Sequence, residues 1–423
     1  MTRKKFLFIP IVLLLVLMLS GFAQAETTNS QPSKETKETK EKWRLGTLSG
    51  QVRMFYFMQE DRPNGENFDK TKESFAIGGQ LRYETPTIAD HFGAVLNGFV
   101  AAPLFDDLNR ERYAGTGVLD SKNQGYAVLG EAYFKANYAK SVAKIWRQRI
   151  ETPLVNGNDS RLLPNTFEAY RIESSDIEGL KLQAAWVDKI KNRDSDQFVS
   201  MTEAAGVNDK KGGLFMLGGD WQPTEKLKIR VWNYFTPDMD NSLFIEANYS
   251  HDISDALETH IRFQAIDQRD VGSSYLGTYT ANEAGLLWGV KYSGVTLDVG
   301  GTIVDDSADV RYSWGVNPFF NNLMSCGFNR AGEKALYLAA AYDFAKMGIN
   351  GFTANVKAGF GSTPDSGRNA SYDRNEYDLN LLYKFDGYLK GLSFLNRWEY
   401  QDADNSMGGS DVAQVRVRLQ YDF

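Results

Sequence analysis

The carboxyl-terminal stretch Ala413-Gln-Val-Arg-Val-Arg-Leu-Gln-Tyr-Asp-Phe423 alternates strictly between apolar and polar side chains, six of the former and five of the latter. Successive side chains of a β-strand point to opposite faces of the sheet, so this period of two predicts a strand with one apolar and one polar face. The apolar face is expected either against the core of a soluble sandwich or against membrane lipid. The rest of the chain decides between these two settings.

The amino terminus has the organisation of an export signal. A basic segment at 3–5 precedes an apolar run at 6–19, and the small-x-small sequence Ala-Gln-Ala follows at 23–25. This order is typical of a cleaved signal peptide. The run has 14 residues, fewer than the roughly 20 that a transmembrane helix needs. We therefore predict a signal peptide at 1–25.

The composition excludes several classes of protein. No later apolar stretch is long enough for a membrane helix, and the mean hydropathy is −0.41; the alternating strands of a β-barrel also average out as hydrophilic. The formal net charge of −7 argues against nucleic-acid binding. The single cysteine, Cys326, excludes an internal disulfide framework.

Two further segments fit a barrel. The terminal aromatic residues Tyr421 and Phe423 resemble the signal that the outer-membrane barrel-assembly machinery reads, and we predict that they serve as this assembly signal. Residues 26–42 are rich in Lys, Glu and Thr and have no apolar positions of a coiled coil, so we predict a charged periplasmic tail. Because no internal linker or change of period follows, 43–423 is predicted to be one transmembrane β-barrel.

Eighteen segments repeat the alternation of the last strand. They span residues 48–59, 73–84, 92–102, 126–138, 141–150, 167–175, 179–188, 213–221, 226–235, 242–250, 257–267, 282–292, 294–304, 334–343, 351–360, 375–385, 390–400 and 412–423. An even number of strands is what a single-chain bacterial barrel requires, and sixteen is the alternative count.

The segments are joined alternately by short turns and long polar loops. Residues 138–140, 175–178, 222–225 and 386–389 are short connections, whereas 103–125, 151–166, 189–212 and 305–333 are long ones. Short periplasmic turns and long extracellular loops are typical of outer-membrane barrels, and a soluble sandwich gives no reason for the alternation. The sequence therefore predicts an all-β fold, a transmembrane antiparallel β-barrel of 18 strands, closed so that no sheet edge is exposed.

Basic residues are frequent on the polar face of the strands, which lines the lumen if the apolar face contacts lipid. They are Arg53, Arg82, Lys181, Lys228, Arg230, Arg262, Arg397, Arg416 and Arg418. One interpretation is a solvated wall in which these cations pair with carboxylates, namely Glu84, Glu246, Glu258 and Glu399. The other is a basic track that guides anionic groups by successive weak contacts, since arginine binds a carboxylate through two hydrogen bonds and stays charged.

The loop at 151–166 is the best candidate for a constriction. A barrel of about 16 to 18 strands encloses an aqueous channel, so a selective pore needs a segment that folds inward. This loop is polar and carries Asp159 and Arg161. Pro153 and Pro164 restrict its backbone, which favours a defined conformation.

Three stretches around this loop carry a family resemblance. They are Arg147-Gln-Arg-Ile-Glu-Thr-Pro-Leu154, Asn158-Asp-Ser-Arg-Leu-Leu-Pro-Asn-Thr-Phe167 and Ile177-Glu-Gly-Leu-Lys-Leu182. The chain here resembles the OprD-like family of outer-membrane substrate-specific porins, and elsewhere it agrees in length, strand rhythm and carboxyl-terminal pattern. The resemblance implies an 18-stranded barrel whose third outer loop forms an eyelet, with a basic ladder facing an acidic residue on that loop. By position it implies Asp159 as the loop acid and Arg161 as its neighbouring anchor. Glu168-Ala169 replaces the glycine that family members usually have here, which leaves the choice of substrate open.

The resemblance also implies a function. We expect passive transport of small hydrophilic solutes across the outer membrane, particularly carboxylate-bearing nutrients such as amino acids, peptides or aromatic acids. A general diffusion porin and a surface-exposed adhesin are the alternatives.

An enzyme is not expected, because His91, His251 and His260 lie beside short turns or within a strand rather than with a nucleophile at the rim. No cofactor or metal is expected. The expected partners are the solutes, outer-membrane lipids and the assembly machinery, and a monomer and a trimer both remain open.

Overall fold

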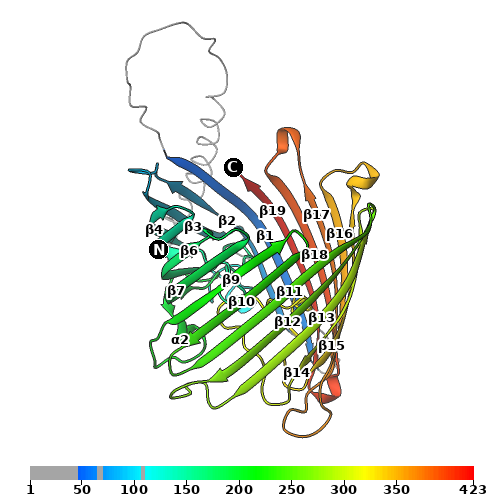
Figure 1. The fold of residues 1–423 in the computed structure, drawn as a ribbon. Helices are drawn as coiled ribbons and strands as arrows, with labels where there is room; N and C mark the ends of the chain where they lie inside the picture. Colours follow the sequence, from blue (N-terminus) through cyan, green and yellow to red (C-terminus); the bar gives the residue numbers. More distant parts are fainter. Residues whose placement is uncertain (1–45, 64–69, 106–109) are drawn as a thin grey trace, which may run out of the picture.

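The computed structural model describes residues 46–63, 70–105 and 110–423, and one antiparallel sheet curls round and closes on itself (Figure 1). The predicted signal peptide at 1–25 and charged tail at 26–42 lie outside the described residues. None of the helices in the described ranges is long and apolar enough to span a membrane.

The first nine strands are β1 (Thr47–Pro63), β2 (Lys70–Glu84), β3 (Phe92–Pro103), β4 (Tyr126–Tyr138), β5 (Ser141–Gln148), β6 (Thr166–Ser174), β7 (Leu180–Lys191), β8 (Val199–Ser200) and β9 (Leu214–Thr224). They are followed by β10 (Leu227–Thr236), β11 (Asp240–Ser254), β12 (Leu257–Asp270), β13 (Thr280–Tyr292), β14 (Val295–Val304), β15 (Lys334–Asp343), β16 (Phe352–Ser362), β17 (Arg374–Lys384), β18 (Leu392–Ala403) and β19 (Ser410–Asp422). The helical turns are η1 (Glu111–Tyr113), α2 (Met201–Ala204), η2 (Phe344–Met347), η3 (Gly387–Leu389) and η4 (Asn405–Met407).

Eighteen of these strands form the closed wall and confirm the predicted fold. Each predicted segment overlaps one wall strand, with bounds that differ by a few residues. The extra strand, β8, is only two residues long and pairs with the end of β7 inside a connection. Its brevity explains why no alternation in the sequence predicts it.

The last strand closes the barrel against the first. Arg418 of β19 lies opposite Phe55 of β1. Beyond the strand, the backbone N–H of Phe423 donates to the Gly50 carbonyl at 3.0 Å, and the Phe423 carbonyl accepts from the Gly50 N–H at 2.9 Å. A side chain at Gly50 would place its Cβ 2.4 Å from the Phe423 ring. The missing side chain at Gly50 therefore makes room for the terminal aromatic residue.

The two faces of the wall differ as the alternation predicts. Large apolar side chains are exposed on the outer face, among them Met54, Leu217, Phe263, Leu286, Trp288, Leu338, Trp398 and Leu419. Polar side chains of opposite parity are buried inside, among them Asn97, Gln264, Gln268 and Gln414. An apolar outer band and a polar lumen are the pattern of a barrel that sits in lipid.

The connections are short at one end of the barrel and long at the other. Residues 139–140, 225–226, 255–256 and 293–294 are tight turns at the end that also holds the carboxyl terminus (Figure 1). At the opposite end, 149–165, 192–213 and 305–333 are long. Two connections at this end, 237–239 and 404–409, are nevertheless short, so the alternation of loop length is a tendency of this chain rather than a strict rule.

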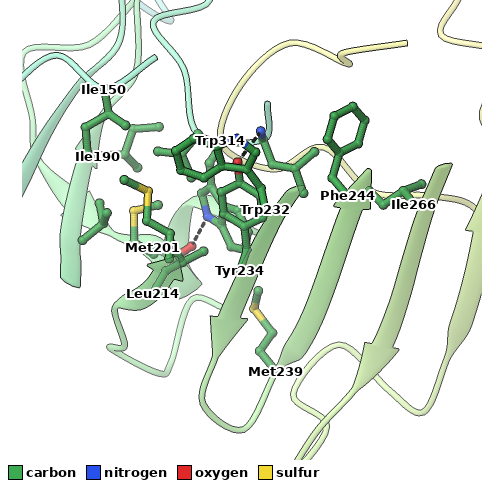
Figure 2. Packing of buried hydrophobic residues seen from close by; sticks show 14 of the residues in the cluster. Ile150, Ile190, Met201, Leu214, Trp232, Tyr234, Met239, Phe244, Ile266 and Trp314 are labelled. Carbon is green, nitrogen blue, oxygen red and sulfur yellow. Dashed lines mark hydrogen bonds between the residues drawn. The ribbon is translucent and has the colours of Figure 1, made fainter. Parts of the chain in front are cut away.

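The long loops fill part of the lumen with an apolar core (Figure 2). Trp232 and Tyr234 of β10 point inward, are each 1% exposed and pack with Leu154 from the loop 149–165 and Trp314 from the loop 305–333. The indole N–H of Trp314 donates to the Met201 carbonyl of α2 at 2.8 Å (Figure 2). Loops held by buried aromatic residues have a fixed position, because removing such contacts costs several kcal/mol.

Candidate functional site

Four arginines lie close together on three adjacent strands of the inner wall. Arg416 of β19 is directly opposite Arg397 of β18, and Arg418 follows two residues after Arg416 on the same face. Arg53 of β1 lies opposite Gln420, which is two residues further along β19. Like charges on directly opposed residues repel one another, so this part of the wall holds a concentrated positive charge.

The loop 149–165 crosses the lumen to this basic wall. Its side chains Leu162 and Leu163 are buried against Phe55 and Phe57 of β1. At its other end, Leu154 packs in the apolar core that contains Trp232 and Trp314, and its backbone N–H donates to the Tyr234 hydroxyl at 3.2 Å. The loop is therefore attached to two different parts of the wall.

Asp159 ties this loop to Arg53. Arg53 Nη1 and Nη2 donate to Asp159 Oδ1 and Oδ2 at 2.5 and 2.9 Å, and Nη1 also donates to the Arg161 carbonyl at 3.0 Å. The Arg53 side chain is 4% exposed and that of Asp159 is 34% exposed. Burial alone would raise the pKa of Asp159, but the hydrogen bonds and charge of Arg53 outweigh it and lower the pKa below its ordinary value. The carboxylate is thus held ionised by a guanidinium that it neutralises.

Arg161 lies beside the Arg53–Asp159 ion pair and has no acidic partner within 4.0 Å among the described residues. Its Nε donates to the Thr116 carbonyl at 3.0 Å, and its guanidinium lies 4.7 Å from the centroid of the Phe57 ring. Burial, reinforced by the positive charge of Arg416 and its neighbours, lowers the pKa of Arg161 well below the usual range. Backbone carbonyls and an aromatic face hold this cation, so its charge is not cancelled.

The loop 305–333 is a second inward segment, which the sequence analysis did not single out as a constriction. Its Met324 carbonyl accepts from Arg416 Nη2 at 2.9 Å, and its Phe320 N–H donates to Gln264 Oε1 at 2.9 Å. The Val316 N–H donates to Asn156 Oδ1 of the loop 149–165 at 3.0 Å. The two loops therefore meet inside the barrel. A signal was present in the sequence, because an exposed loop has no reason to carry as many large apolar residues as this one does.

The remaining predicted wall cations behave differently. Carboxylates bind most of them: Arg82 contacts Glu84 at 2.7 Å, Lys181 contacts Glu173 at 3.3 Å, and Lys228 and Arg230 contact Asp220 at 3.4 and 3.1 Å. Arg230 also lies 3.8 Å from Glu246, and Arg262 donates to Asn248 at 2.6 Å. In this part of the wall the cations pair with carboxylates, as the first interpretation predicts.

The unpaired cations are those beside the inward loops. Arg397 donates to Asn380, and Arg416 to Gln414 and to the Met324 carbonyl. The Nε of Arg418 is buried and makes no hydrogen bond with the described part of the chain. No ion pair within 4.0 Å involves these three arginines in the described ranges.

Comparison with known proteins identifies this arrangement. The family model for outer membrane porins of the OprD family matches residues 45–423. The chain belongs to the OprD family. Porin D of Pseudomonas aeruginosa is 22% identical over 400 residues, which cover 88% of this chain and 89% of that protein. The solved OccK9 (OpdG) of Pseudomonas aeruginosa aligns with a TM-score of 0.80 at 22% identity, over 89% of this chain and 98% of that one. OpdK of Pseudomonas aeruginosa, solved with vanillate, aligns with a TM-score of 0.77 at 20% identity, over 89% and 98% of the two chains.

Membership of this family settles the general activity. OprD-family proteins are porins, so this OprD-family porin is a substrate-specific channel of the bacterial outer membrane and is not an enzyme. Small solutes cross the membrane through its lumen.

Gly315 lies where the two inward loops meet. A Cβ at this position would lie 2.5 Å from the Asn156 side-chain amide, which is itself hydrogen-bonded to Val316. We expect Gly315→Ala to separate the loops, to destabilise their contact by about 1–3 kcal/mol, and to raise the single-channel conductance in planar bilayers. Gly98→Ala is the matched control, because nothing lies within 4 Å of a Cβ there. Equal conductance in both variants would show that the loop contact does not set the width of the pore.

Proposed function

We propose that this OprD-family porin is selective for small solutes that carry a carboxylate, and that Arg397 and Arg418 recognise this group. Both side chains are partly exposed on the lumen face and belong to no ion pair among the described residues. One observation supports the proposal most strongly: these cations lack acidic partners, whereas Arg82, Lys228 and Arg230 are paired with carboxylates. Arginine next to arginine binds a planar carboxylate well, because each guanidinium offers parallel donors.

We further propose that the constriction is formed by Asp159 and Arg161, which lie against this wall where the loop meets β1. Because Arg53 neutralises Asp159, the net charge of the eyelet is set by Arg161 together with Arg416. A solute carboxylate that enters the eyelet meets positive charge from the loop and from the wall beside it. Where water is partly excluded, such charges interact more strongly than in bulk solvent. The proposal agrees with the chemistry of vanillate, an aromatic carboxylate with which OpdK was solved.

The proposed selectivity is tested by single-channel recording in planar bilayers with two probes of equal shape, benzoate and benzamide. We expect brief, concentration-dependent blocks of the current by benzoate and none by the neutral benzamide. A large conductance indifferent to both probes would instead identify a general diffusion porin. Protein that inserts but conducts no ions would point to a surface adhesin.

We also propose that Tyr421 and Phe423 are read by the barrel-assembly machinery. The hydrogen bonds of Phe423 to Gly50 involve only its backbone, so Phe423→Ala leaves the closing ladder intact. We expect this variant to refold in detergent as efficiently as the wild type, yet to accumulate less in the outer membrane of cells. Fractionation with immunoblotting measures the second quantity. The matched control is Tyr388→Ala, which removes an exposed aromatic residue at the same end of the barrel; an equal loss in both variants contradicts a specific signal.

A further inference from the structure

Three carboxylates form a cluster on the inner wall beside the unpaired arginines. Glu376 and Asp378 project from the same face of β17, and Asp378 lies directly opposite Glu399 of β18. One oxygen from each of the three can be chosen so that all lie within 4.8 Å of one another. Two like charges directly opposite on neighbouring strands destabilise a sheet, so the arrangement needs a compensating charge.

Two of these carboxylates have no partner in the described residues. Asp378 and Glu399 are 3% and 4% exposed, and all four of their oxygens are buried without a hydrogen bond. Glu376 differs, because its oxygens accept the backbone N–H groups of Met324, Ser325 and Cys326 at 2.5 to 3.3 Å. A buried carboxylate without a donor or counter-ion is costly. The four free oxygens therefore point to a ligand that supplies positive charge.

The basic residues nearby do not supply it by contact. Lys357 lies opposite Asp378 in the register of β16 and β17, and Arg397 and Arg416 flank Glu399. None of them comes within 4.0 Å of the cluster in an ion pair of the described chain. Arg397 donates to Asn380 instead, and Arg416 donates to the Met324 carbonyl. These cations reduce the repulsion at longer range and leave the carboxylate oxygens unpaired.

We propose that Glu376, Asp378 and Glu399 bind one divalent cation of the calcium type. Ca²⁺ prefers carboxylate and carbonyl oxygens at about 2.3–2.6 Å and tolerates irregular geometry, so two ligands on opposite sides of the ion lie about 5 Å apart. The 4.8 Å span of the cluster fits this distance. Mg²⁺ is smaller and demands a regular octahedron, so it fits less well.

Such an ion would fix the second inward loop. Glu376 already holds the backbone at 324–326, and a shared cation would join it to Asp378 and to Glu399 on the next strand. The ion would thus couple two strands of the wall to the loop 305–333. Calcium removal is expected to loosen the loop and to increase the current fluctuations of the open channel, without abolishing the channel.

The test uses the full mature chain refolded in detergent after treatment with EDTA. Titration calorimetry with CaCl₂ should show about one bound ion per chain, and the thermal unfolding temperature should rise with calcium and much less with magnesium. A protein that binds no calcium and whose unfolding temperature does not respond to it overturns the proposal, and a proton shared among the carboxylates would then be the explanation.

Matched variants locate the ion. Asp378→Asn combined with Glu399→Gln removes two charges with little change of shape, and it should abolish both the calorimetric signal and the calcium-dependent shift. In EDTA this variant should be at least as stable as the wild type, because the repulsion is gone. Asp378→Asn alone serves if the pair does not refold. Glu173→Gln, which changes a lumen carboxylate bound to Lys144 and Arg171, should keep the full calcium response; the same loss in this control contradicts the assignment.

Discussion

Asp159→Asn is expected to open the constriction and to destabilise the inward loop. The change removes the carboxylate that accepts both guanidinium nitrogens of Arg53, at 2.5 and 2.9 Å, and leaves Arg53 buried at 4% exposure. Removing one partner of a fully buried ion pair costs about 3–5 kcal/mol. Because the Asp159 side chain is 34% exposed, solvent screening lowers this to about 1–3 kcal/mol.

The loss of this ion pair should change the conductance of the channel without unfolding the barrel. The wall is held by strand pairing, so the barrel is expected to stay assembled while the loop leaves the lumen. We expect a larger single-channel conductance and weaker block by benzoate in planar bilayers, together with faster proteolysis within 149–165. Asp196→Asn, on another loop and outside any ion pair of the described residues, is the control. An unchanged conductance in Asp159→Asn would contradict the role of the clamp.

The same clamp predicts a pH dependence. The pKa of Asp159 is lower in the folded chain than its ordinary value of 3.8. A group of this kind stabilises the fold above its ordinary pKa, and the contribution disappears as the pH falls through the lowered value. The conductance should therefore be constant between about pH 5 and 8 and should rise only in stronger acid. In Asp159→Asn the acid-induced rise should be absent.

Removing the unpaired wall cations should have the largest effect on selectivity. Arg397→Gln combined with Arg418→Gln keeps polar side chains at two positions of the lumen but deletes two charges. An ionic contact at about 4 Å contributes about 1 kcal/mol in water and more where water is excluded. We therefore expect benzoate block to weaken by about fivefold or more for each charge removed, and the reversal potential in a KCl gradient to shift toward cation preference.

A second double variant distinguishes recognition by Arg397 and Arg418 from attraction by the net charge of the pore. Lys228→Gln combined with Arg230→Gln removes the same number of charges from a part of the wall where Asp220 and Glu246 already pair with them. We expect a smaller shift of the reversal potential and no loss of benzoate block. If both double variants lose block equally, the lumen attracts carboxylates by its overall field and the proposed recognition by Arg397 and Arg418 is wrong.

The sequence predicted the wall better than the lumen, for a physical reason. Alternation reports which face a side chain occupies: in the predicted strand 226–235, Trp232 and Tyr234 are buried inside the barrel, whereas Val231 and Phe235 are exposed on its outer face. Alternation does not report the register between strands distant in sequence. Arg53 and Arg418 have the same parity and lie on neighbouring strands, yet one binds Asp159 and the other has no acidic partner in the described chain.

The direction of the loops was predictable only in part. The family resemblance and the prolines single out the loop around Asp159 as a candidate for an inward fold. The loop 305–333 is predicted only as a long loop, although it folds inward and buries Trp314 and Phe328. Its position depends on contacts with Gln264, Glu376 and Asn156, which are far away in the sequence. The large apolar residues of this loop were the available signal in the sequence. The lipid-facing side of the wall is already covered by apolar side chains of the strands, so apolar residues in a long loop indicate that the loop folds into the barrel.

The location of a bound carboxylate tests the central claim most directly. Crystals of the refolded protein soaked in 4-bromobenzoate should show a bromine anomalous peak in the lumen, with the carboxylate between Arg397 and Arg418 and within reach of Arg161. Arg397→Gln combined with Arg418→Gln should lose this peak under the same soak. A carboxylate bound instead beside Lys228 and Arg230, or a peak unchanged in the double variant, would contradict the account.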